Sequence, residues 1–348
     1  MPKKSNVVKV QNWPVHYRTG LERALESTRR HNRRRKRLKW GVDMLRGVCA
    51  SWGRLLFWSR EQAWYEATMP IELMLTPERV EAFVTDLIVC GNKPATIRHR
   101  IMGLERMLAA LTPKCDRDWL NAIKYRFSKT GDRAEKRSRL QFTNVLIRFA
   151  ASLAESADEL AEIDPIQGAV LYRVALQIMW LSYQPMRLKN FQQLTLGREV
   201  IPIEGRQWRS DIPASATKRG NAYDPVLPAR LVKHLEHYRF LHLPKLGGDA
   251  EAGPLWLTVK GQRQSARSIY YYVCRHTEKR FGRSMCPHLF RDAVMTTVAT
   301  QMPENVRMGM HLVGNRDQDC MATHYDQSQR ATADAKFNAA IDAWEDAA

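Results

Sequence analysis

His288 and Arg291 stand three residues apart in the segment Pro-His-Leu-Phe-Arg-Asp. This segment opens a predicted helix, so the two side chains lie one turn apart on the same face. A histidine titrates near neutral pH and can move a proton in either direction, and the planar guanidinium of arginine can hold phosphate oxygens. The spacing alone decides little, because His31 and Arg34 repeat it inside a basic tract.

Four further segments that carry polar side chains occur in a fixed order around this pair. They are residues 186–191 with Arg187 after an apolar helix, residues 217–220 with Lys218 in a hairpin turn, residues 312–315 with Asn315 at a helix end, and residues 323–326 with Tyr325. Taken singly, each has an ordinary interpretation as a salt-bridge partner, a solvated loop cation or a half-buried tyrosine. Together, in this order, they resemble the tyrosine recombinases, the phage integrase family. The resemblance runs over residues 141–330.

The resemblance implies a role for each of these residues at one scissile DNA phosphate. Tyr325 would attack phosphorus and form a 3′-phosphotyrosine bond, which conserves the energy for rejoining. Arg187 and Arg291 would hold the non-bridging oxygens, Lys218 would protonate the 5′ leaving oxygen, and His288 would move the proton of the tyrosine. Such chemistry implies no cofactor and no metal ion.

The sequence departs from the family pattern at several positions. Asn315 stands where the family usually has a histidine, and its amide can donate a hydrogen bond but cannot carry charge. We favour Asn315 as a weakened replacement, with His311 one turn earlier as the alternative. Pro185, Asn190 and Asp292 also replace residues that are more usual in the family. These departures bear on the expected rate of catalysis more than on the expected mechanism.

The charge of the chain is strongly positive and unevenly distributed. The formal net charge is +19, and residues 1–60 contain 16 Lys and Arg against 3 Asp and Glu, with Arg34 and Arg35 at the centre. Such a surface favours a polyanion with steep salt dependence, a solvated basic tail being the alternative. After Tyr325 the sign reverses, so we expect the C-terminal tail to contact protein rather than DNA.

Hydrophobic periodicity predicts a mainly α protein with a small antiparallel β-sheet, an α+β class. Helices are predicted from residue 38, from Thr76-Pro77, from Pro94, over 119–127, 145–154, 169–183, 229–240, 265–281, 289–300, 306–313 and 331–344, and strands over 201–203, 207–212 and 223–227. The predicted organisation is a basic extension (1–37), a helical core-binding domain (38–130), a linker (131–140), a catalytic domain (141–330) and a C-terminal helix (331–348). That last helix either docks on a neighbouring protomer or folds back on its own domain.

The helix from Pro94 is basic on its outer faces, where it carries Arg98, Arg100 and Arg106. The segments L-T-P-E-R-V-E-A-F and K-P-A-T-I-R resemble helix openings of the family's core-binding domain. The resemblance therefore implies that these arginines, with Arg34 and Arg35, contact DNA.

Other classes of site and location are disfavoured by composition. No apolar run approaches the roughly 18–20 residues of a bilayer span, and the six cysteines form no C-x-x-C pair. His234, His237 and His242 are spaced loosely like metal ligands, but no Cys or carboxylate set accompanies them, so we expect no metal site. The expected location is the bacterial cytoplasm, in association with the nucleoid.

The function that the sequence favours is a site-specific DNA recombinase serving integration or excision of a mobile element. The resemblance to the tyrosine recombinases implies that its partners are double-stranded DNA and three further copies in a tetramer on paired sites, with a directionality factor or a sister recombinase as a further partner. The alternatives are a catalytically weakened DNA-binding relative, which Asn315 motivates, and a type IB topoisomerase. A metal-dependent transposase or nuclease is disfavoured, because it would need an acidic cluster to hold the metal and the sequence shows no convincing one.

Overall fold

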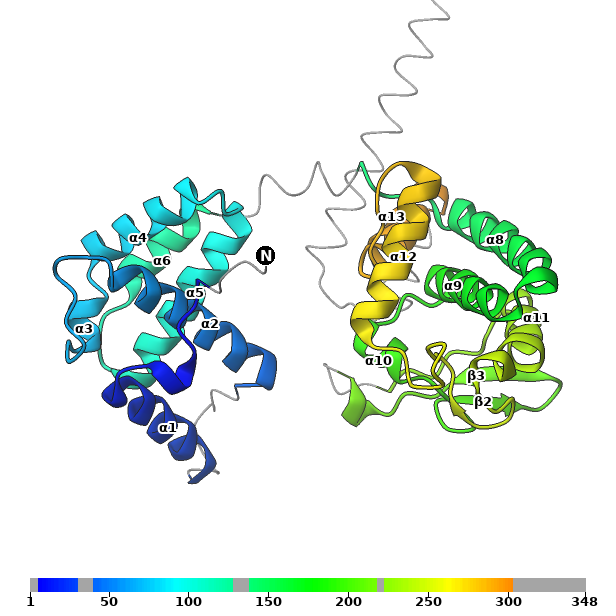
Figure 1. Cartoon of the computed structure of the whole chain (residues 1–348), viewed down its shortest axis with the longest axis horizontal. Helices are drawn as coiled ribbons and strands as arrows, with labels where there is room; N and C mark the ends of the chain where they lie inside the picture. The colour runs from blue at the N-terminus through cyan, green and yellow to red at the C-terminus, as the bar shows by residue number, and fades with distance from the viewer. Residues whose placement is uncertain (1–5, 31–39, 128–137, 218–221, 303–348) are drawn as a thin grey trace, which may run out of the picture. The chain divides into compact units, whose positions relative to one another are not determined.

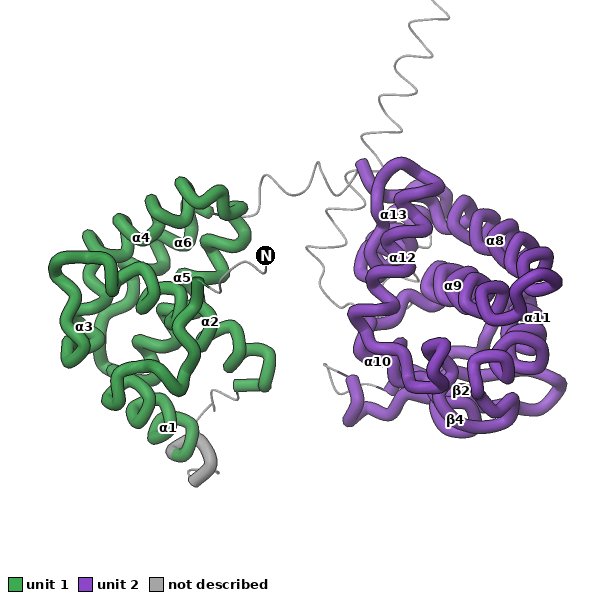
Figure 2. The backbone as a smooth tube through the Cα atoms, in the orientation of Figure 1, with its two compact units in different colours: residues 1–133 green, residues 134–348 purple. Residues whose placement is uncertain are grey.

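The computed structural model describes residues 6–30, 40–127, 138–217 and 222–302, which fall into two compact units, 1–133 and 134–348 (Figure 2). Each unit has its own hydrophobic core. None of the described helices is long and apolar enough to cross a membrane. The predicted helices over 306–313 and 331–344 lie outside the described residues.

The first unit is helical throughout its described residues (Figure 1). Its elements are a 3₁₀ turn (Val10–Asn12), α1 (Val15–Arg30), α2 (Val42–Ser59), α3 (Ile71–Met74), α4 (Pro77–Val89), α5 (Pro94–Leu111) and α6 (Asp118–Arg126). Helices α2 and α5 pack closely, because Gly103 of α5 leaves room for Ser51 of α2. Trp52, Phe83 and Leu104 are fully buried at the centre of this unit.

The structure confirms the helix start that the sequence predicts at Thr76-Pro77. Thr76 caps the helix, accepting a hydrogen bond at Oγ1 from the Arg79 amide at 3.4 Å, and Pro77 occupies the first turn, where no amide hydrogen is needed. Gly91 follows the helix with a φ of 72°, a left-handed conformation that glycine adopts without strain.

The N-terminal segment differs from the expected extension over residues 1–37. Val8, Trp13, Tyr17 and Leu21 are buried in the core of the first unit. The Trp13 indole donates to the Val8 carbonyl at 2.9 Å, and the Val8 amide donates to the Gly53 carbonyl at 3.0 Å. Residues 8–21 therefore belong to the first unit, because burial of their aromatic side chains outweighs the basic character of the segment.

The second unit surrounds one buried helix, α9 (Figure 1). Its helical elements are α8 (Thr143–Ile163), α9 (Pro165–Tyr183), α10 (Leu188–Gln193), a 3₁₀ turn (Ala214–Ala216), α11 (Ala229–His237), a π-helical turn (Tyr238–His242), a 3₁₀ turn (Pro244–Leu246), α12 (Ala266–Phe281) and α13 (Leu289–Gln301). Thirteen of the 19 residues of α9 are buried, and α8, α11, α12 and α13 all pack against it. A helix that is apolar all round is expected at the centre of a domain.

A small sheet lies beside these helices, in the strand order β3-β2-β1-β4. The strands are β1 (Thr195–Leu196), β2 (Val200–Ile203), β3 (Gln207–Ser210) and β4 (Gly253–Pro254). The sheet is mixed rather than purely antiparallel, because β1 pairs with β2 in parallel at Leu196 and Val200. The predicted strand over 223–227 forms only isolated bridges, Arg209 with Val226 and Ile212 with Tyr223. Pro225 in this segment has no amide hydrogen to donate to a regular ladder.

Candidate active site

Arg187 stands at the junction between α9 and α10. Helix α9 ends at Tyr183, because Pro185 disfavours the helical conformation of Gln184, whose φ and ψ are −128° and 83°. Arg187 then caps α10, and its carbonyl accepts from the amides of Asn190 and Phe191, each at 2.9 Å. Its side chain is half-buried. The proline and the helix cap together fix the backbone that carries this guanidinium group.

Arg291 reaches this junction from the first turn of α13. Its Nη1 donates to the carbonyl oxygen of Pro185 at 2.7 Å, although the two residues are 106 positions apart in the sequence. The acceptor lies two residues before Arg187. The structure therefore brings the Arg291 side chain to the backbone of the segment that carries Arg187.

His288 occupies the N-cap position of α13, and its side chain is exposed. Its carbonyl accepts from the Arg291 amide at 3.2 Å, which closes the first turn of the helix and leaves the two side chains one turn apart. At the start of α13 the imidazole of His288 is therefore exposed to solvent, and Arg291 one turn later is half-buried.

The stem of a β-hairpin is attached to the same segment. Gln184 donates from Nε2 to the Val226 carbonyl at 3.2 Å, and its Oε1 accepts from the Ser210 hydroxyl at 2.9 Å. Ile212 and Tyr223 exchange two backbone hydrogen bonds, each of 2.9 Å. One glutamine amide thus joins both sides of the stem to the end of α9.

Tyr223 lies close enough to Arg291 for the two to interact electrostatically. Burial raises the pKa of the Tyr223 phenol, and the positive charge of Arg291 opposes that rise. Sequence reasoning missed both Gln184 and Tyr223 as positioning residues, because their partners are distant in the chain and no local pattern marks them.

Six of the residues to which the sequence gives a role lie outside the described residues. They are Arg34, Arg35, Lys218, His311, Asn315 and Tyr325. Arg187, His288 and Arg291 are the members of the predicted catalytic set that the structure describes.

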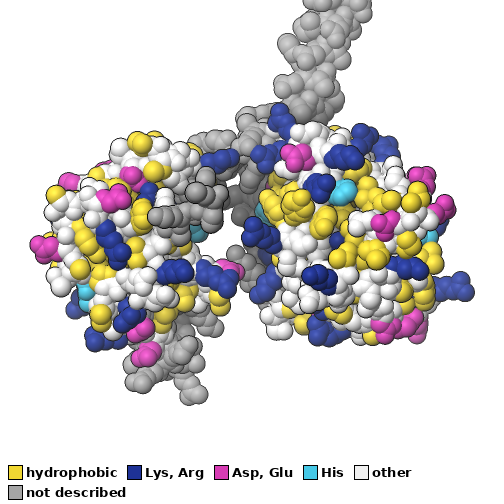
Figure 3. Space-filling view, in the orientation of Figure 1, with side chains coloured by type: hydrophobic (Ala, Val, Ile, Leu, Met, Phe, Trp, Pro, Cys, Tyr) yellow, Lys and Arg dark blue, Asp and Glu magenta, His cyan; other side chains and the backbone are white. Residues whose placement is uncertain are grey.

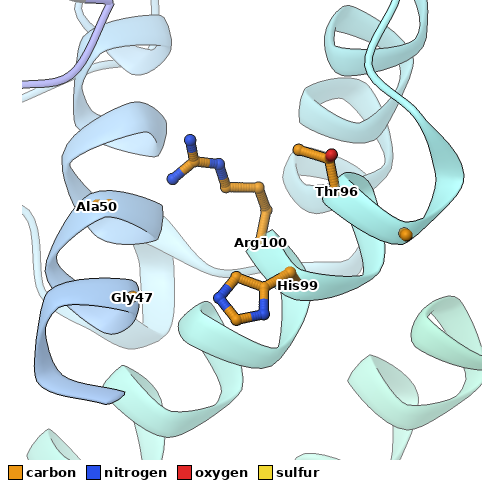
Figure 4. Close-up of a pocket in the computed structure, with 6 residues that line it drawn as sticks. Gly47, Ala50, Thr96, His99 and Arg100 are labelled. Atoms are coloured by element: carbon orange, nitrogen blue, oxygen red, sulfur yellow. The ribbon is translucent and has the colours of Figure 1, made fainter. Parts of the chain in front are cut away.

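In the first unit, the predicted DNA-binding arginines Arg98, Arg100 and Arg106 are half-buried on α5. Arg100 lines a hollow of about 480 Å³ between α5 and α2, together with Thr96, His99 and Gly47 (Figure 4). Burial lowers the pKa of Arg100, and the nearby charge of Arg54 adds to this effect. Arg54 pairs with Asp86 at 2.6 Å, whereas Arg100 has no carboxylate partner within 4 Å among the described residues.

The histidine cluster has a carboxylate that the sequence did not reveal. Asp158 of α8 lies beside His237 and His242, 79 and 84 positions away in the sequence. No local pattern could have connected residues so far apart.

No protein-family model and no curated protein sequence matches this chain. Solved structures do match. The Tn1549 transposon integrase in complex with circular intermediate DNA aligns with a TM-score of 0.51 and 12% identity, over 90% of this chain and 98% of that chain. The chain has the tyrosine-recombinase fold.

Two further tyrosine-recombinase structures also align. The Tn1549 integrase with transposon right end DNA gives a TM-score of 0.49 at 13% identity, and XerA recombinase gives 0.38 at 14%; each covers 91% of this chain and 98% of its own. The predicted fold class is confirmed, apart from the parallel pair in the sheet. In this tyrosine-recombinase fold, Arg291 in the first turn of α13 donates to the Pro185 carbonyl, which lies just after the end of α9.

Proposed function

We propose that the chain is a site-specific DNA recombinase that cleaves and rejoins DNA through a phosphotyrosine intermediate on Tyr325. The hydrogen bond from Arg291 to Pro185 carries this proposal, because it joins two arginine-bearing segments in a tyrosine-recombinase fold. Two arginines on segments that meet in this way suit a phosphodiester, whose non-bridging oxygens accept paired N–H donors.

The proposed reaction conserves the number of phosphoester bonds. The Tyr325 oxygen attacks phosphorus, and the bond from phosphorus to the 5′ oxygen breaks. The phosphate then links the tyrosine oxygen to the 3′ end of the cleaved strand. His288 accepts the phenol proton, and Lys218 donates a proton to the departing 5′ oxygen. Rejoining reverses these transfers with a new 5′ hydroxyl.

The arginine pair supplies electrostatic stabilisation in this scheme. Negative charge builds on the non-bridging oxygens as the nucleophile adds, and cations held in place beforehand lower the energy of that state. Asn315 adds an N–H donor without a charge, so its contribution is smaller than that of an imidazolium. His311 remains the alternative donor.

The hairpin stem supports the proposed role of Lys218. Lys218 precedes Tyr223 by five residues in the sequence, and Tyr223 interacts with Arg291. The bonds of Gln184 fix this stem to the segment of Arg187. A lysine carried on such a stem can reach the leaving oxygen of the phosphate that the arginines hold.

The first unit is proposed to hold the DNA duplex. Arg98, Arg100 and Arg106 lie on α5, and Arg100 has no carboxylate partner within 4 Å among the described residues, so its charge is available to a phosphate. Arg34 and Arg35 extend this basic set in the sequence. Figure 3 shows Lys and Arg side chains on the visible face of each unit. The neighbouring Tn1549 integrase structures contain DNA.

The proposal extends to assembly and biological role. Four copies would bridge two DNA sites, and the acidic, apolar segment after Tyr325 would dock on a neighbouring protomer. A directionality factor or sister recombinase would select the outcome. The proposed setting is a mobile element in the bacterial cytoplasm, at the nucleoid.

A suicide substrate tests the catalytic proposal. A nick near the cleavage site makes the fragment that carries the new 5′ hydroxyl so short that it diffuses away. Rejoining is then prevented, and the covalent complex accumulates. The unmodified chain should form a denaturation-resistant DNA adduct, and Tyr325→Phe should form none, because phenylalanine has no nucleophilic oxygen. Tyr125→Phe is the matched control, since Tyr125 is 79% exposed on α6 and should retain the adduct.

The same assay addresses the second candidate, a DNA-binding relative without cleavage, which Asn315 favours. DNA binding with no adduct from the unmodified chain would support this candidate and overturn the recombinase proposal. An adduct that persists in Tyr325→Phe would show that another residue is the nucleophile.

A further inference from the structure

Three side chains from two distant segments meet at one point in the second unit. Asp158 lies on α8, His237 ends α11, and His242 ends the π-helical turn. Both imidazoles direct Nε2 at the same carboxylate oxygen, Oδ1 of Asp158, at 2.9 Å from His237 and 2.8 Å from His242. The ligand atoms of the three residues all lie within 4.8 Å of one another.

The π-helical turn is what aligns the two histidines. Residues five apart on a regular α-helix differ by about 140° in direction and do not share a face. Here the Leu243 amide donates to the Tyr238 carbonyl at 2.8 Å, a bond over five residues that widens the turn. His237 and His242 therefore both face Asp158. Single π-helical turns are uncommon and occur often at functional sites.

Tyr172 of α9 fixes the orientation of both rings. Its ring stacks on His237 with centroids 5.0 Å apart and on His242 with centroids 4.2 Å apart. Its hydroxyl is bonded to His234 Nδ1 at 2.9 Å, which places that third histidine outside the trio. The ring positions are thus set by aromatic packing before any ligand arrives.

Burial differs between the members of the trio in a way that leaves one side open. The His242 side chain is 4% exposed, whereas those of His237 and Asp158 are 37% and 44% exposed. A small ion can reach the convergent atoms from the side of Asp158, and water can complete its coordination.

We propose that Asp158, His237 and His242 bind a single Zn²⁺ ion. Two imidazole nitrogens and one carboxylate oxygen are a ligand set that Zn²⁺ favours, with water in the fourth tetrahedral position. The ion would join α8 to the turn that follows α11, and would therefore stabilise the second unit. This proposal is independent of the proposed recombinase function.

The site is separate from the arginine pair. Tyr172, which packs on the trio, lies eleven residues before Tyr183 on α9, a distance of about 16 Å along the helix axis. Arg187 follows beyond that end of the helix. The ion is accordingly assigned to stability and not to phosphate chemistry.

Metal titration of the full chain tests the site. The chain is first stripped with EDTA and dialysed, then titrated with Zn²⁺ by calorimetry and with Co²⁺ by visible absorption, which reports tetrahedral coordination. Asp158→Asn and His237→Gln should each weaken binding by at least about 10–100-fold, because each loses a direct ligand. His276→Gln on α12 is the matched control and should bind as the unmodified chain does.

Thermal unfolding provides a second readout. Zn²⁺ at about 100 times its Kd should raise the Tm of the unmodified chain by about 5–10 °C, and the same concentration should raise the Tm of Asp158→Asn by no more than about half as much. The Asp158 side chain is only partly buried, so the asparagine variant should fold, which circular dichroism checks. Failure of the unmodified chain to bind Zn²⁺, or equal binding by Asp158→Asn, would show that the trio is only a hydrogen-bonded cluster.

Discussion

The guanidinium group of Arg291 is held by a backbone carbonyl, that of Pro185, at 2.7 Å. This acceptor carries no formal charge, so the bond orients the side chain without neutralising it. A guanidinium has five N–H donors in a fixed plane, and the proposed function assigns a planar pair of them to the phosphate.

Replacing Arg291 by lysine should therefore impair cleavage more than DNA binding. The ammonium group keeps the charge but loses the planar pair of donors. We expect adduct formation on the suicide substrate to slow by about 10²–10³-fold, while affinity in a gel-shift assay changes little. Arg267→Lys, at an exposed position of α12, should cleave at the normal rate. Equal rates for both variants would contradict the role assigned to Arg291.

Individual site residues could be predicted from the sequence where they belong to motifs that occur in a fixed order along the chain. Arg187, His288 and Arg291 could be named because the motifs occur in a fixed order, and Arg291 was then found at the segment of Arg187. Asp158 could not be named, since its contact with His242 spans 84 residues and exists only in the fold.

At the scale of elements, the tight pairing of α8 with α9 depends on Gly168. A Cβ atom at this position would lie 2.5 Å from Cα and 2.6 Å from the backbone nitrogen of Ala161 on α8. Backbone atoms cannot move aside as a flexible side chain does, so the two helices would have to separate.

Gly168→Ala should destabilise the second unit by about 1–3 kcal/mol, despite the higher helix propensity of alanine. Hydrogen–deuterium exchange should show α8 and α9 amides exchanging about 10–100-fold faster, with the first unit as internal reference. Gln167→Ala, an exposed neighbour on the same helix, should leave exchange unchanged. Unaltered exchange in Gly168→Ala would mean that α8 can shift without loss of packing.

Local signals predicted helix starts better than they predicted how far each element extends. The Thr76-Pro77 start of α4 was found in the structure, because a cap and a proline act within one turn. Helix α8 runs to Ile163 rather than ending near Ala154, since the part of the helix after Ala154 buries only Ala157 and gives little hydrophobic periodicity. The π-helical turn left no sequence signal, because it depends on contacts with α8 and α9.

At the scale of the whole molecule, half-buried histidines make stability depend on pH. Burial lowers the pKa of His276, and the charges of Arg275 and Lys279 lower it further. Burial is also the largest cause of the lowered pKa of His234, with Arg230 next. Both groups take up a proton more readily in the unfolded chain than in the folded one.

The free energy of unfolding should therefore fall as the pH falls from about 7.5 to about 5.5. Above the unfolded pKa of about 6.5 these histidines are neutral in both states; below it the unfolded state gains protons first, and the loss continues down to the lowered folded pKa. Urea denaturation in EDTA measures the change. The free energy of unfolding of His276→Gln should depend less steeply on pH than that of the unmodified chain. An equal slope for the two proteins would contradict this account.

The edge-to-face contact between Tyr17 and Trp52, with ring centroids 4.9 Å apart, has a practical consequence for anyone who wishes to shorten the chain. Tyr17 is fully buried and covers Trp52, so a truncated variant that begins after this tyrosine would expose an indole to water and invite self-association. A useful fragment of the first unit has to start ahead of Val8, inside the stretch that looks most dispensable by its charge.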